Sequence, residues 1–445
     1  MMRRIGIICL WLLAAFLIFV CASLYDPYLV ALRGQGRIIL PVVSFVTIGL
    51  LVIGGALRKG IGGKLLVLLW CLPPVAMAWA ETGFQTQKRM ALRADGKQAQ
   101  DLGRHFIVGY SSFDDVAPLA AKGLIGGIYV TRRNISGRTA DDLKSDISTL
   151  QAMRRAAGLP PLIVAADQEG GIVSHLSSRS TSLPALSTLT NLPADKRLKM
   201  AEGFGHIHGH ELTSLGVTLN FAPVVDLLRI QPRNLFDTHS LISRRAISGD
   251  PETVTEIALA YVRGLETAGV AATVKHFPGL GRVRDDTHHF RANLDTPVAE
   301  LESSDWIPFR QTLARSNAYL MIGHVAVTAI DPERAASHSK RVVNDLVRDQ
   351  WGHQGIIVTD DLVMGAVYKN GICKTAIEGL NAGVDLLLIA YDGQQFYRTF
   401  NCALAAFSKG QLNKPMLEKS VARLDVRIPD RQPGMRISEV LGLGR

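Results

Sequence analysis

The N-terminal part of the chain is dominated by long apolar runs. Residues 5–24 and residues 38–57 each extend for 20 positions without a charge, and residues 65–80 form a run of 16 positions. Because about 20 apolar residues span the core of a bilayer, the first two runs predict transmembrane helices and the third is marginal. A cleaved signal peptide is the alternative for the first run, since Arg3 and Arg4 precede it.

Positive charges beside these runs predict an orientation. One basic group precedes the first run and a second lies between the second and third runs; the residues are Arg3, Arg4, Arg58, Lys59 and Lys64. Lys and Arg favour the cytoplasmic side, so three spans would place the following domain on the outer side of a membrane. Arg33 and Arg37 argue against this, because they lie in the loop that it puts outside. If the third run does not cross, the domain stays in the cytoplasm.

From about residue 100 onward, a helical pattern repeatedly ends in glycine and a short apolar run follows. The glycines at these joints are Gly123, Gly158, Gly216, Gly269, Gly352 and Gly383. Glycine ends helices because it adopts the left-handed backbone without steric cost. The runs that follow are continuously apolar rather than alternating, which indicates strands buried on both faces of a parallel sheet.

Two further apolar runs, residues 105–110 and 318–324, bring the predicted strands to eight. Helix-start signals agree, since Asp250 precedes a proline and Thr139 with Asp142 predicts a capping box. Alternating helices and buried strands predict an α/β protein, and eight strands favour a (β/α)8 barrel over an open doubly wound sheet. We therefore expect a membrane region with two or three transmembrane helices at residues 1–85 and a barrel at residues 98–430.

Polar, reactive side chains follow many of the predicted strands. They are Asp167, Asp226, Lys275, His276, His324 and Asp360. The carboxyl ends of barrel strands form one face, which is the catalytic face of this fold. Their convergence predicts an active site there.

Asp360 directly follows a buried strand and precedes Asp361. A carboxylate at a barrel mouth can attack an anomeric carbon and form a covalent glycosyl-enzyme. The alternative is that Asp360 or Asp361 caps the next helix.

A glycine-rich loop at residues 275–288 reads KHFPGLGRVRDDTH and ends in Asp286 and His288. In an extended loop these two side chains project to the same side, so the carboxylate can orient the imidazole and raise its basicity. The imidazole would then protonate a leaving oxygen and activate water in a second step. A local Asx-type turn is the alternative reading.

Charge and cysteine content narrow the choice of partners. A net charge of +10 predicts affinity for acidic surfaces such as anionic lipid or an anionic cell-wall polymer. Nucleic acid is not expected, because no basic run is interleaved with aromatic residues. Outside the apolar runs only Cys373 and Cys402 remain, which predicts neither a disulfide framework nor a zinc site.

Two groups of side chains that include histidines could bind a metal ion. His206, His208 and His210 lie in a helix predicted over residues 194–215, where His206 and His210 are one turn apart. The sequence offers no partner ligand for them, so a structural or exposed role is favoured. The second group, Asp285, Asp286, His288 and His289, is surrounded by glycines that fix no metal geometry.

The ordered motifs of the chain resemble glycoside hydrolase family 3, and within it the bacterial β-N-acetylglucosaminidases (β-N-acetylhexosaminidases) of peptidoglycan turnover. The resemblance covers roughly residues 100–425 and rests on GLIGGIYVTRRN, PLIVAADQEGGIV, LNFAPVVDL, SRRAISGDP, KHFPGLGRVRDDTH, MIGHV and IIVTDDLVMGAV. The loop that ends in Asp-Thr-His distinguishes the N-acetylglucosaminidases from the β-glucosidases of the family.

This resemblance implies a (β/α)8 barrel and a retaining mechanism without metal or cofactor. It assigns the nucleophile to Asp360 and the proton-transfer dyad to Asp286 and His288. It assigns sugar contacts to four residues: Asp167, Arg245, Lys275 and His276. Such charge-assisted hydrogen bonds orient a sugar as well as bind it.

Three positions depart from the family pattern. Leu280 replaces the usual His or Asn of the loop, and Ile172 and His175 replace two usual arginines. These changes put substrate choice in question more than reaction type. A catalytically weakened glycan-binding relative is therefore one alternative. A phosphorylase that uses the same intermediate is another, because His288 repels phosphate less than a glutamate would, and a metal-dependent hydrolase is the third.

With the apolar runs, the resemblance predicts an enzyme of the bacterial inner membrane whose catalytic domain faces the periplasmic or outer side. Its predicted partners are the lipid bilayer and an amino-sugar glycan. The sequence does not predict the oligomeric state.

Overall fold

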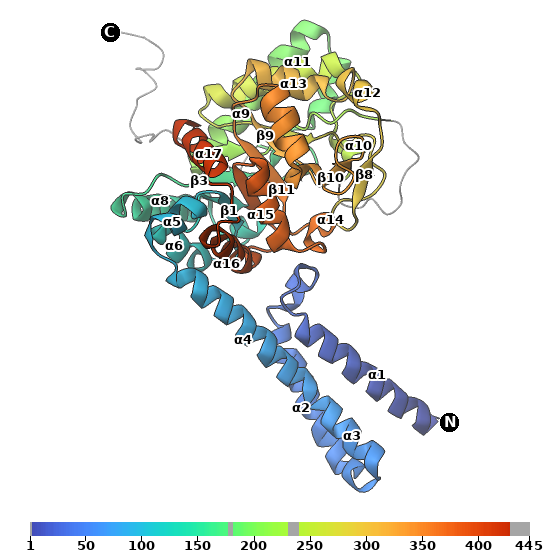
Figure 1. The fold of residues 1–445 in the computed structure, drawn as a ribbon. Helices are drawn as coiled ribbons and strands as arrows, with labels where there is room; N and C mark the ends of the chain where they lie inside the picture. The colour runs from blue at the N-terminus through green and yellow to red at the C-terminus, as the bar shows by residue number, and fades with distance from the viewer. Residues whose placement is uncertain (1, 177–180, 230–239, 428–445) are drawn as a thin grey trace. The chain divides into compact units, whose positions relative to one another are not determined.

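The computed structural model describes residues 2–176, 181–229 and 240–427. The chain divides into two compact units, Met1–Arg93 and Ala94–Arg445 (Figure 1). This division falls between the predicted end of the membrane region at residue 85 and the predicted start of the barrel at residue 98. The last predicted barrel residues, 428–430, lie outside the described part of the chain.

The first unit is helical. Its elements are α1 Met2–Ala22, η1 Pro27–Leu32, α2 Gly36–Ile53, η2 Ala56–Arg58, α3 Ile61–Trp70 and α4 Leu72–Arg93. Three stretches are apolar and long enough to cross a membrane by length and composition: Ile5–Ala22, Gly36–Ile53 and Ile61–Arg93. The third combines α3 and α4, which are separated only by Cys71. The third apolar run is therefore part of a much longer helical stretch than its 16 residues suggested.

Two apolar clusters fix the relative direction of these helices. Ala14 of α1 and Trp70 of α3 share one cluster, and further along both chain segments Cys21 and Met77 share the second. α1 therefore runs parallel to the α3–α4 stretch. In α2 the order is reversed, because Leu40 near its start reaches the second cluster while later residues reach only the first. The three segments are thus arranged up, down and up.

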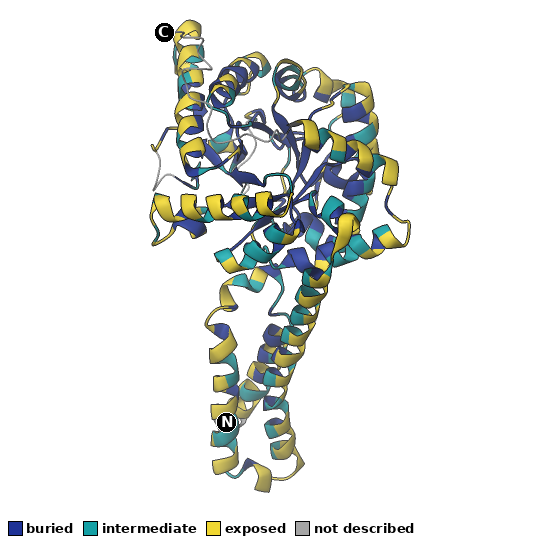
Figure 2. Ribbon diagram, turned by 90° about the vertical axis from the view of Figure 1, so that its left-hand side faces the viewer, coloured by how far each residue is buried: buried dark blue, intermediate teal, exposed yellow. Residues whose placement is uncertain are grey.

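Much of this unit is exposed (Figure 2), and many of its exposed side chains are large and apolar. Ile53 is 85% exposed, Ile61 77% and Trp79 72%. An apolar surface of this kind marks contact with a membrane or another protein.

The second unit is an α/β fold built on eight parallel strands. They are β1 Phe106–Gly109, β2 Gly127–Val130, β3 Ile163–Ala166, β6 Leu219–Asn220, β7 Thr273–Phe277, β9 Tyr319–Ile322, β11 Ile357–Asp361 and β12 Leu386–Ile389. Their order in the sheet is β6-β3-β2-β1-β12-β11-β9-β7. Parallel bridges between Leu219 and Ala271 and between Val224 and Lys275 connect its two ends, so the barrel is nearly closed. The predicted eight-stranded barrel is confirmed, and each predicted run contributes one strand.

Two small sheets decorate the barrel, β4 Gln168–Gly170 with β5 Val173–Ser174 and β8 Ala292–Leu294 with β10 Val325–Val327. The helices and turns are α5 Gly96–Gly103, α6 Phe113–Lys122, α7 Arg132–Ile135, α8 Ala140–Ala156, η3 Leu186–Asn191, α9 Ala194–Leu215, α10 Ile242–Arg245, α11 Pro251–Thr267, α12 Val298–Glu302, α13 Ile307–Arg315, η4 Ala336–His338, η5 Arg341–Gln350, α14 Gly365–Tyr368, α15 Ile372–Ala382, α16 Gln395–Ser408 and α17 Lys414–Arg427.

The predicted helix boundaries are also confirmed. All six joint glycines have positive φ angles, from 65° at Gly158 to 99° at Gly383. The Asp250 carboxylate accepts a hydrogen bond from the Thr253 N–H at the start of α11, and Thr139 and Asp142 form the capping box of α8. Local signals thus set where each helix begins and ends.

The cysteine prediction was wrong in one respect. Cys373 of α15 and Cys402 of α16 form a disulfide with a sequence separation of 29 residues. Two cysteines so far apart show no framework pattern in the sequence. The barrel brings them together because α15 and α16 pack side by side after β11 and β12.

Side chains of alternating strand positions fill the barrel interior. Ile163 and Ala165 of β3 point inward, as do Ile356 and Val358 at β11, and the strands are buried (Figure 2). With a period of two, the next inward positions are Asp167 and Asp360, and Lys275 follows in the same way after Ala271 and Thr273. Three of the predicted site residues therefore reach the barrel mouth through the register of their strands.

Candidate active site

Asp360 lies at the carboxyl end of β11, where its Oδ1 accepts a hydrogen bond of 2.8 Å from the Asp361 N–H. Burial would raise the pKa of the Asp360 carboxyl, but the nearby His276, His324 and His288 and the Asp361 N–H outweigh it. The pKa is therefore held below its usual value. The side chain is ionised at neutral pH, as a carboxylate nucleophile must be.

The Asp286–His288 pair forms the predicted contact. The buried Asp286 Oδ1 accepts hydrogen bonds from the His288 N–H at 3.0 Å and from the His288 ring Nδ1 at 2.9 Å. The Asx turn and the dyad are therefore not alternatives, because one carboxylate oxygen makes both. The His288 side chain is 36% exposed. With Nδ1 bound to the carboxylate, its Nε2 is the nitrogen available for proton transfer.

The loop that carries His288 is hydrogen-bonded to the segment that follows Asp360. Gly365 N–H donates to the His288 carbonyl at 2.8 Å, and Ala366 N–H donates to the Thr287 carbonyl at 3.1 Å. Both donors lie in α14, at the end of β11. This contact brings the two predicted catalytic groups to the same site.

The four predicted sugar-binding residues belong to one buried network. The Lys275 ammonium forms ion pairs with Asp167 and, at 2.6 Å, with Glu169. Arg245 binds both oxygens of Glu169, at 2.6 and 3.0 Å. Two carboxylates are thus matched by two cations, which is the condition for keeping such groups charged in a buried site.

The charged groups of this network shift one another's pKa values. Burial would raise the pKa of Asp167, yet the Lys275 ammonium and further donors lower it to about 2. Burial would lower the pKa of Lys275, yet Asp167 and Glu169 raise it. The network therefore stays fully charged across the neutral range.

His276, the fourth of these residues, connects the network to Asp226. Its Nδ1 lies 2.7 Å from Asp226 Oδ2, and its Nε2 lies 3.2 Å from the Arg245 guanidinium. A carboxylate only accepts, so the His276 Nδ1–H donates to Asp226. Asp226 also accepts from the Leu280 N–H at 2.7 Å and so anchors the glycine-rich loop.

Asp361 supports the nucleophile from behind. Its carboxylate accepts hydrogen bonds from the N–H groups of Val363, Ala390 and Tyr391, at 3.2, 2.9 and 2.8 Å. Burial raises its pKa to about 7, against the lowering effect of these donors. The helix-cap reading of this pair is wrong, because α14 starts four residues later with Met364 as its cap.

His324 supports the same strand end. Its Nε2 lies 2.9 Å from the Asp361 carbonyl and its Nδ1 lies 2.7 Å from the Ser337 hydroxyl. Burial lowers the pKa of His324, so the ring is neutral and donates to the carbonyl from Nε2. Of the polar strand-end residues, His324 therefore holds the backbone beside Asp360.

Sequence reasoning missed the role of Glu169 and the involvement of Tyr129. Glu169 stands two positions after Asp167, so the alternation of an extended strand was a usable signal. Tyr129 sits inside an apolar run and gave no signal, yet its hydroxyl lies 2.5 Å from Asp167 Oδ2. Of the departing residues, Leu280 is buried and Ile172 is exposed in the β4–β5 hairpin.

The histidine run on α9 does not form a metal site among the described residues. His206 and His210 are exposed, with ring centroids 6.4 Å apart. His208 is buried, and its Nδ1 lies 2.7 Å from the Tyr261 hydroxyl. Across residues 2–176, 181–229 and 240–427, no group of three or more His, Cys, Asp and Glu side chains is placed to hold a metal ion.

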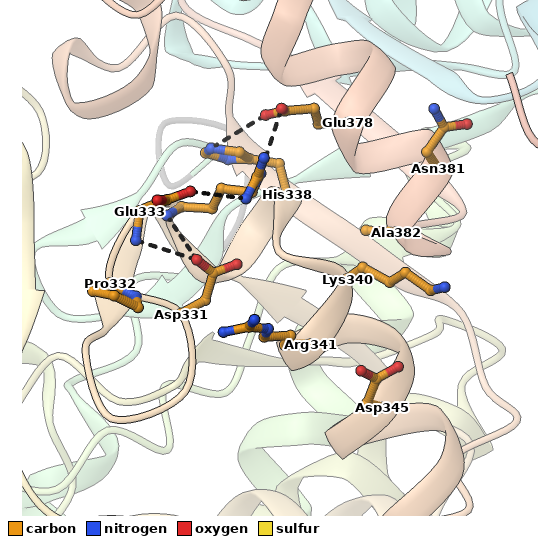
Figure 3. Close-up of a pocket in the computed structure, with 11 residues that line it drawn as sticks. Asp331, Pro332, Glu333, His338, Lys340, Arg341, Asp345, Glu378, Asn381 and Ala382 are labelled. Carbon is orange, nitrogen blue, oxygen red and sulfur yellow. Dashed lines mark hydrogen bonds and ion pairs between the residues drawn. The ribbon is translucent and has the colours of Figure 1, made fainter. Parts of the chain in front are cut away.

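A separate hollow of about 560 Å³ lies between α15 and η5 and contains none of the predicted site residues (Figure 3). Its charged groups bind one another. Arg334 and His338 approach Glu378, at 3.4 and 4.0 Å, and Asp331 accepts from the backbone N–H groups of Glu333 and Arg334. The residues that line this hollow are not those of the candidate active site at the barrel mouth.

Comparison with known proteins identifies the family of the chain. The family model described as the glycosyl hydrolase family 3 N terminal domain matches residues 101–426. The chain therefore belongs to this family. A β-hexosaminidase of Stenotrophomonas maltophilia (strain K279a) is 34% identical over 271 residues, which are 60% of this chain and 76% of the relative. The chain is accordingly a glycoside hydrolase of the β-N-acetylhexosaminidase type.

Solved structures have the same fold. A family 3 β-N-acetylglucosaminidase from Paenibacillus sp. str. FPU-7 superimposes with a TM-score of 0.68 at 31% identity, covering 77% of this chain and 65% of that chain. A β-N-acetylhexosaminidase from Beutenbergia cavernae DSM 12333 superimposes with a TM-score of 0.66 at 26% identity, covering 75% and 99%.

Proposed function

We propose that this chain is a membrane-tethered, retaining β-N-acetylhexosaminidase. It removes terminal N-acetylglucosamine from amino-sugar glycans such as peptidoglycan fragments, through a covalent glycosyl-enzyme. One observation carries the proposal. An ionised carboxylate at the end of β11 shares a barrel mouth with an Asp–His pair on a loop docked against α14.

In the first step, an Asp360 oxygen attacks the anomeric carbon and the bond to the leaving oxygen breaks. His288 donates its proton to that oxygen, so the leaving group departs as an alcohol. In the second step, His288 takes a proton from water, which attacks the same carbon and releases Asp360. The Asp286 carboxylate stabilises the imidazolium that is present before the first transfer and after the second.

The charged network would hold the sugar. Asp167 retains some exposure, with 17% of its side chain accessible, whereas Lys275 is only 3% exposed. Sugar hydroxyls would therefore meet Asp167 and the edge of Arg245, with Lys275 keeping both carboxylates in place. Charge-assisted hydrogen bonds of this kind give orientation as well as affinity.

The mechanism can be tested with His288→Ala and an activated aryl N-acetyl-β-glucosaminide. Such a leaving group needs no acid, so the first step stays fast while the second becomes slow. We expect a burst of aryl alcohol and a mass increase of one N-acetylhexosamine on the peptide that contains Asp360. The product of the wild-type enzyme should be the β-anomer. Loss of the burst, or release of the α-anomer, would contradict the proposal.

Phosphorolysis is a second candidate, because the proton donor is an imidazole. A neutral or cationic His288 repels phosphate less than a carboxylate would. Assays with and without inorganic phosphate distinguish the two reactions. If the sugar 1-phosphate appears in the presence of phosphate, the activity is phosphorolysis rather than hydrolysis.

The membrane part of the proposal rests on contacts within residues 1–93. Arg37, at the start of α2, forms an ion pair with Glu81 at 3.5 Å and donates to the Tyr25 hydroxyl. The first loop and residue 81 therefore lie at the same level. Three antiparallel crossings would end there and leave residues 82–93 beyond the apolar core. This supports three spans rather than two.

The same contacts account for the arginines that opposed the predicted orientation. Arg37 is paired with Glu81, and the Arg33 guanidinium donates to the carbonyls of Leu24 and Asp26. The charge of Arg37 is thus compensated within the unit, and the Arg33 guanidinium is hydrogen-bonded there. Residues 1–93 carry ten Lys and Arg against two Asp and Glu, which gives +8 of the net +10. The basic character therefore favours the membrane over the glycan as its partner.

The disulfide supports the outer side. Disulfides persist in oxidising compartments and are rare in the bacterial cytoplasm. A reporter placed after residue 95 tests the location, and we expect alkaline phosphatase to be active and a cytoplasmic reporter inactive. Thiol labelling of the full chain from cells adds a second measurement, in which Cys373 and Cys402 should react only after reduction. An active cytoplasmic reporter would overturn the proposal.

A further inference from the structure

Tyr129 places a hydroxyl inside the barrel, next to the candidate sugar-binding residue Asp167. It is the last inward residue of β2, it is 6% exposed, and its ring stacks on Phe221 at 5.8 Å. Its hydroxyl lies 2.5 Å from Asp167 Oδ2 and 3.3 Å from the His175 Nδ1. The other carboxylate oxygen of Asp167 faces the Lys275 ammonium.

The direction of these hydrogen bonds follows from counting protons. A phenol has one proton, and the ionised Asp167 can only accept, so the Tyr129 proton points at Asp167. The Tyr129 oxygen is then the acceptor for His175, which must carry its proton on Nδ1. Burial lowers the pKa of His175, which keeps the ring neutral at neutral pH. The three side chains therefore form a one-way chain from His175 through Tyr129 to Asp167.

We propose that Tyr129 and His175 are positioning residues that fix the direction in which Asp167 accepts a hydrogen bond from the substrate sugar. This inference rests on the proposed function, in which Asp167 binds the terminal sugar. Each side of the carboxylate already has a protein donor. A sugar hydroxyl must therefore approach the 17% of the Asp167 side chain that is exposed along the remaining lone-pair directions.

The hydrogen bonds from His175 through Tyr129 to Asp167 should stabilise the bound substrate and the transition state equally, because Asp167 does not touch the reacting atoms. Without the phenol, the carboxylate can turn away from the sugar or take up water. An interaction made equally in the ground and transition states alters KM and leaves kcat unchanged. Hydrogen bonds to charged groups are strong enough to make the change measurable.

The test compares Tyr129→Phe with the wild-type full chain on an aryl N-acetyl-β-glucosaminide. We expect KM to rise about tenfold and kcat to change by less than about twofold. The ring and its stacking on Phe221 are kept. Tyr110→Phe is the matched control, because its buried hydroxyl has no hydrogen-bond partner among the described residues. It should leave both constants unchanged.

Deoxy substrates add a measurement that a structural role would not move. The 3-, 4- and 6-deoxy analogues each lack one hydroxyl, and the Tyr129→Phe penalty should vanish with the one analogue that lacks the partner of Asp167. A second arm uses His175. The His175→Gln enzyme can still donate to the Tyr129 oxygen, so its KM for the aryl glycoside should be lower than that of the His175→Leu enzyme.

The outcomes are distinct. An inactive wild-type enzyme would reject the proposed function itself. An active wild type with an unchanged KM for Tyr129→Phe would overturn only this inference. So would an equal penalty on all deoxy analogues, or a lower melting temperature with no change in KM.

Discussion

The backbone N–H of Gly365 donates a 2.8 Å hydrogen bond to the carbonyl of His288. The segment after β11, the strand of the proposed nucleophile, is thereby hydrogen-bonded to the loop of the proposed proton donor. A mobile loop could not keep an imidazole at a fixed distance from the anomeric carbon. This contact allows a loop residue to act as the acid.

Asp286→Asn should separate the orienting role of the carboxylate from its charge. The amide oxygen can still accept from the ring Nδ1, but it no longer stabilises the imidazolium. We expect kcat to fall about 100-fold on substrates with poor leaving groups and less than about tenfold on activated aryl glycosides. Rates across a series of phenols of different acidity measure this. An equal loss across the series would argue against the dyad.

The two neighbouring aspartates should respond differently to substitution. Asp360→Asn is expected to reduce kcat about 1,000-fold or more, because an amide cannot form the glycosyl ester, while the fold is retained. Asp361→Asn should destabilise the fold by about 1–3 kcal/mol, because the two carboxylate oxygens together accept from three backbone N–H groups and the amide keeps only one of these oxygens. Activity and thermal unfolding of both variants provide the comparison. Full activity in Asp360→Asn would refute its assignment.

Stability should fall on acidification because of His208. Burial lowers its pKa to about 4, below the value of about 6.5 in an unfolded chain. The unfolded state takes up a proton first, so this contribution is complete above pH 6.5 and is lost as pH falls toward 4. It corresponds to about 3 kcal/mol. Melting temperatures of wild type and His208→Gln between pH 7 and 4.5 should converge at the acidic end. A parallel decline would contradict the assignment.

Removal of the disulfide should weaken the barrel. Cys373→Ser and Cys402→Ser open a loop of 29 residues, which corresponds to about 3–4 kcal/mol in the chain-entropy model. We expect the same lower melting temperature for either variant and for the wild type after reduction. Ser420→Ala is a control variant elsewhere on the barrel that keeps the disulfide, so its melting temperature should still fall on addition of reductant. A wild-type melting temperature that is indifferent to reductant would show that the bond contributes nothing.

The sequence predicted the barrel well because its signals are local. The joint glycines, the helix caps and the continuous apolar runs each act within a few residues. The candidate site residues Asp167, Lys275 and Asp360 were predicted because each stands at the end of a strand, where position along the chain and position in the barrel coincide. Asp360 and Lys275 are inward residues by simple alternation.

Other parts of the site depend on contacts across the barrel. Tyr129 looked like one more apolar strand residue, and only the approach of Asp167 from the next strand gives its hydroxyl a role. The bond between Cys373 and Cys402 likewise depends on how two helices pack. The spacing of these residues along the sequence predicts neither contact.

The disulfide also fixes an order of events in the life of the chain. It encloses most of α15, all of β12 and the first half of α16, close to the end of the barrel. If the domain is exported, the cross-link can form only after nearly the whole barrel has left the cytoplasm. A reactive thiol at Cys373 would therefore identify chains whose export is incomplete, and the loss of this thiol would show when export ends.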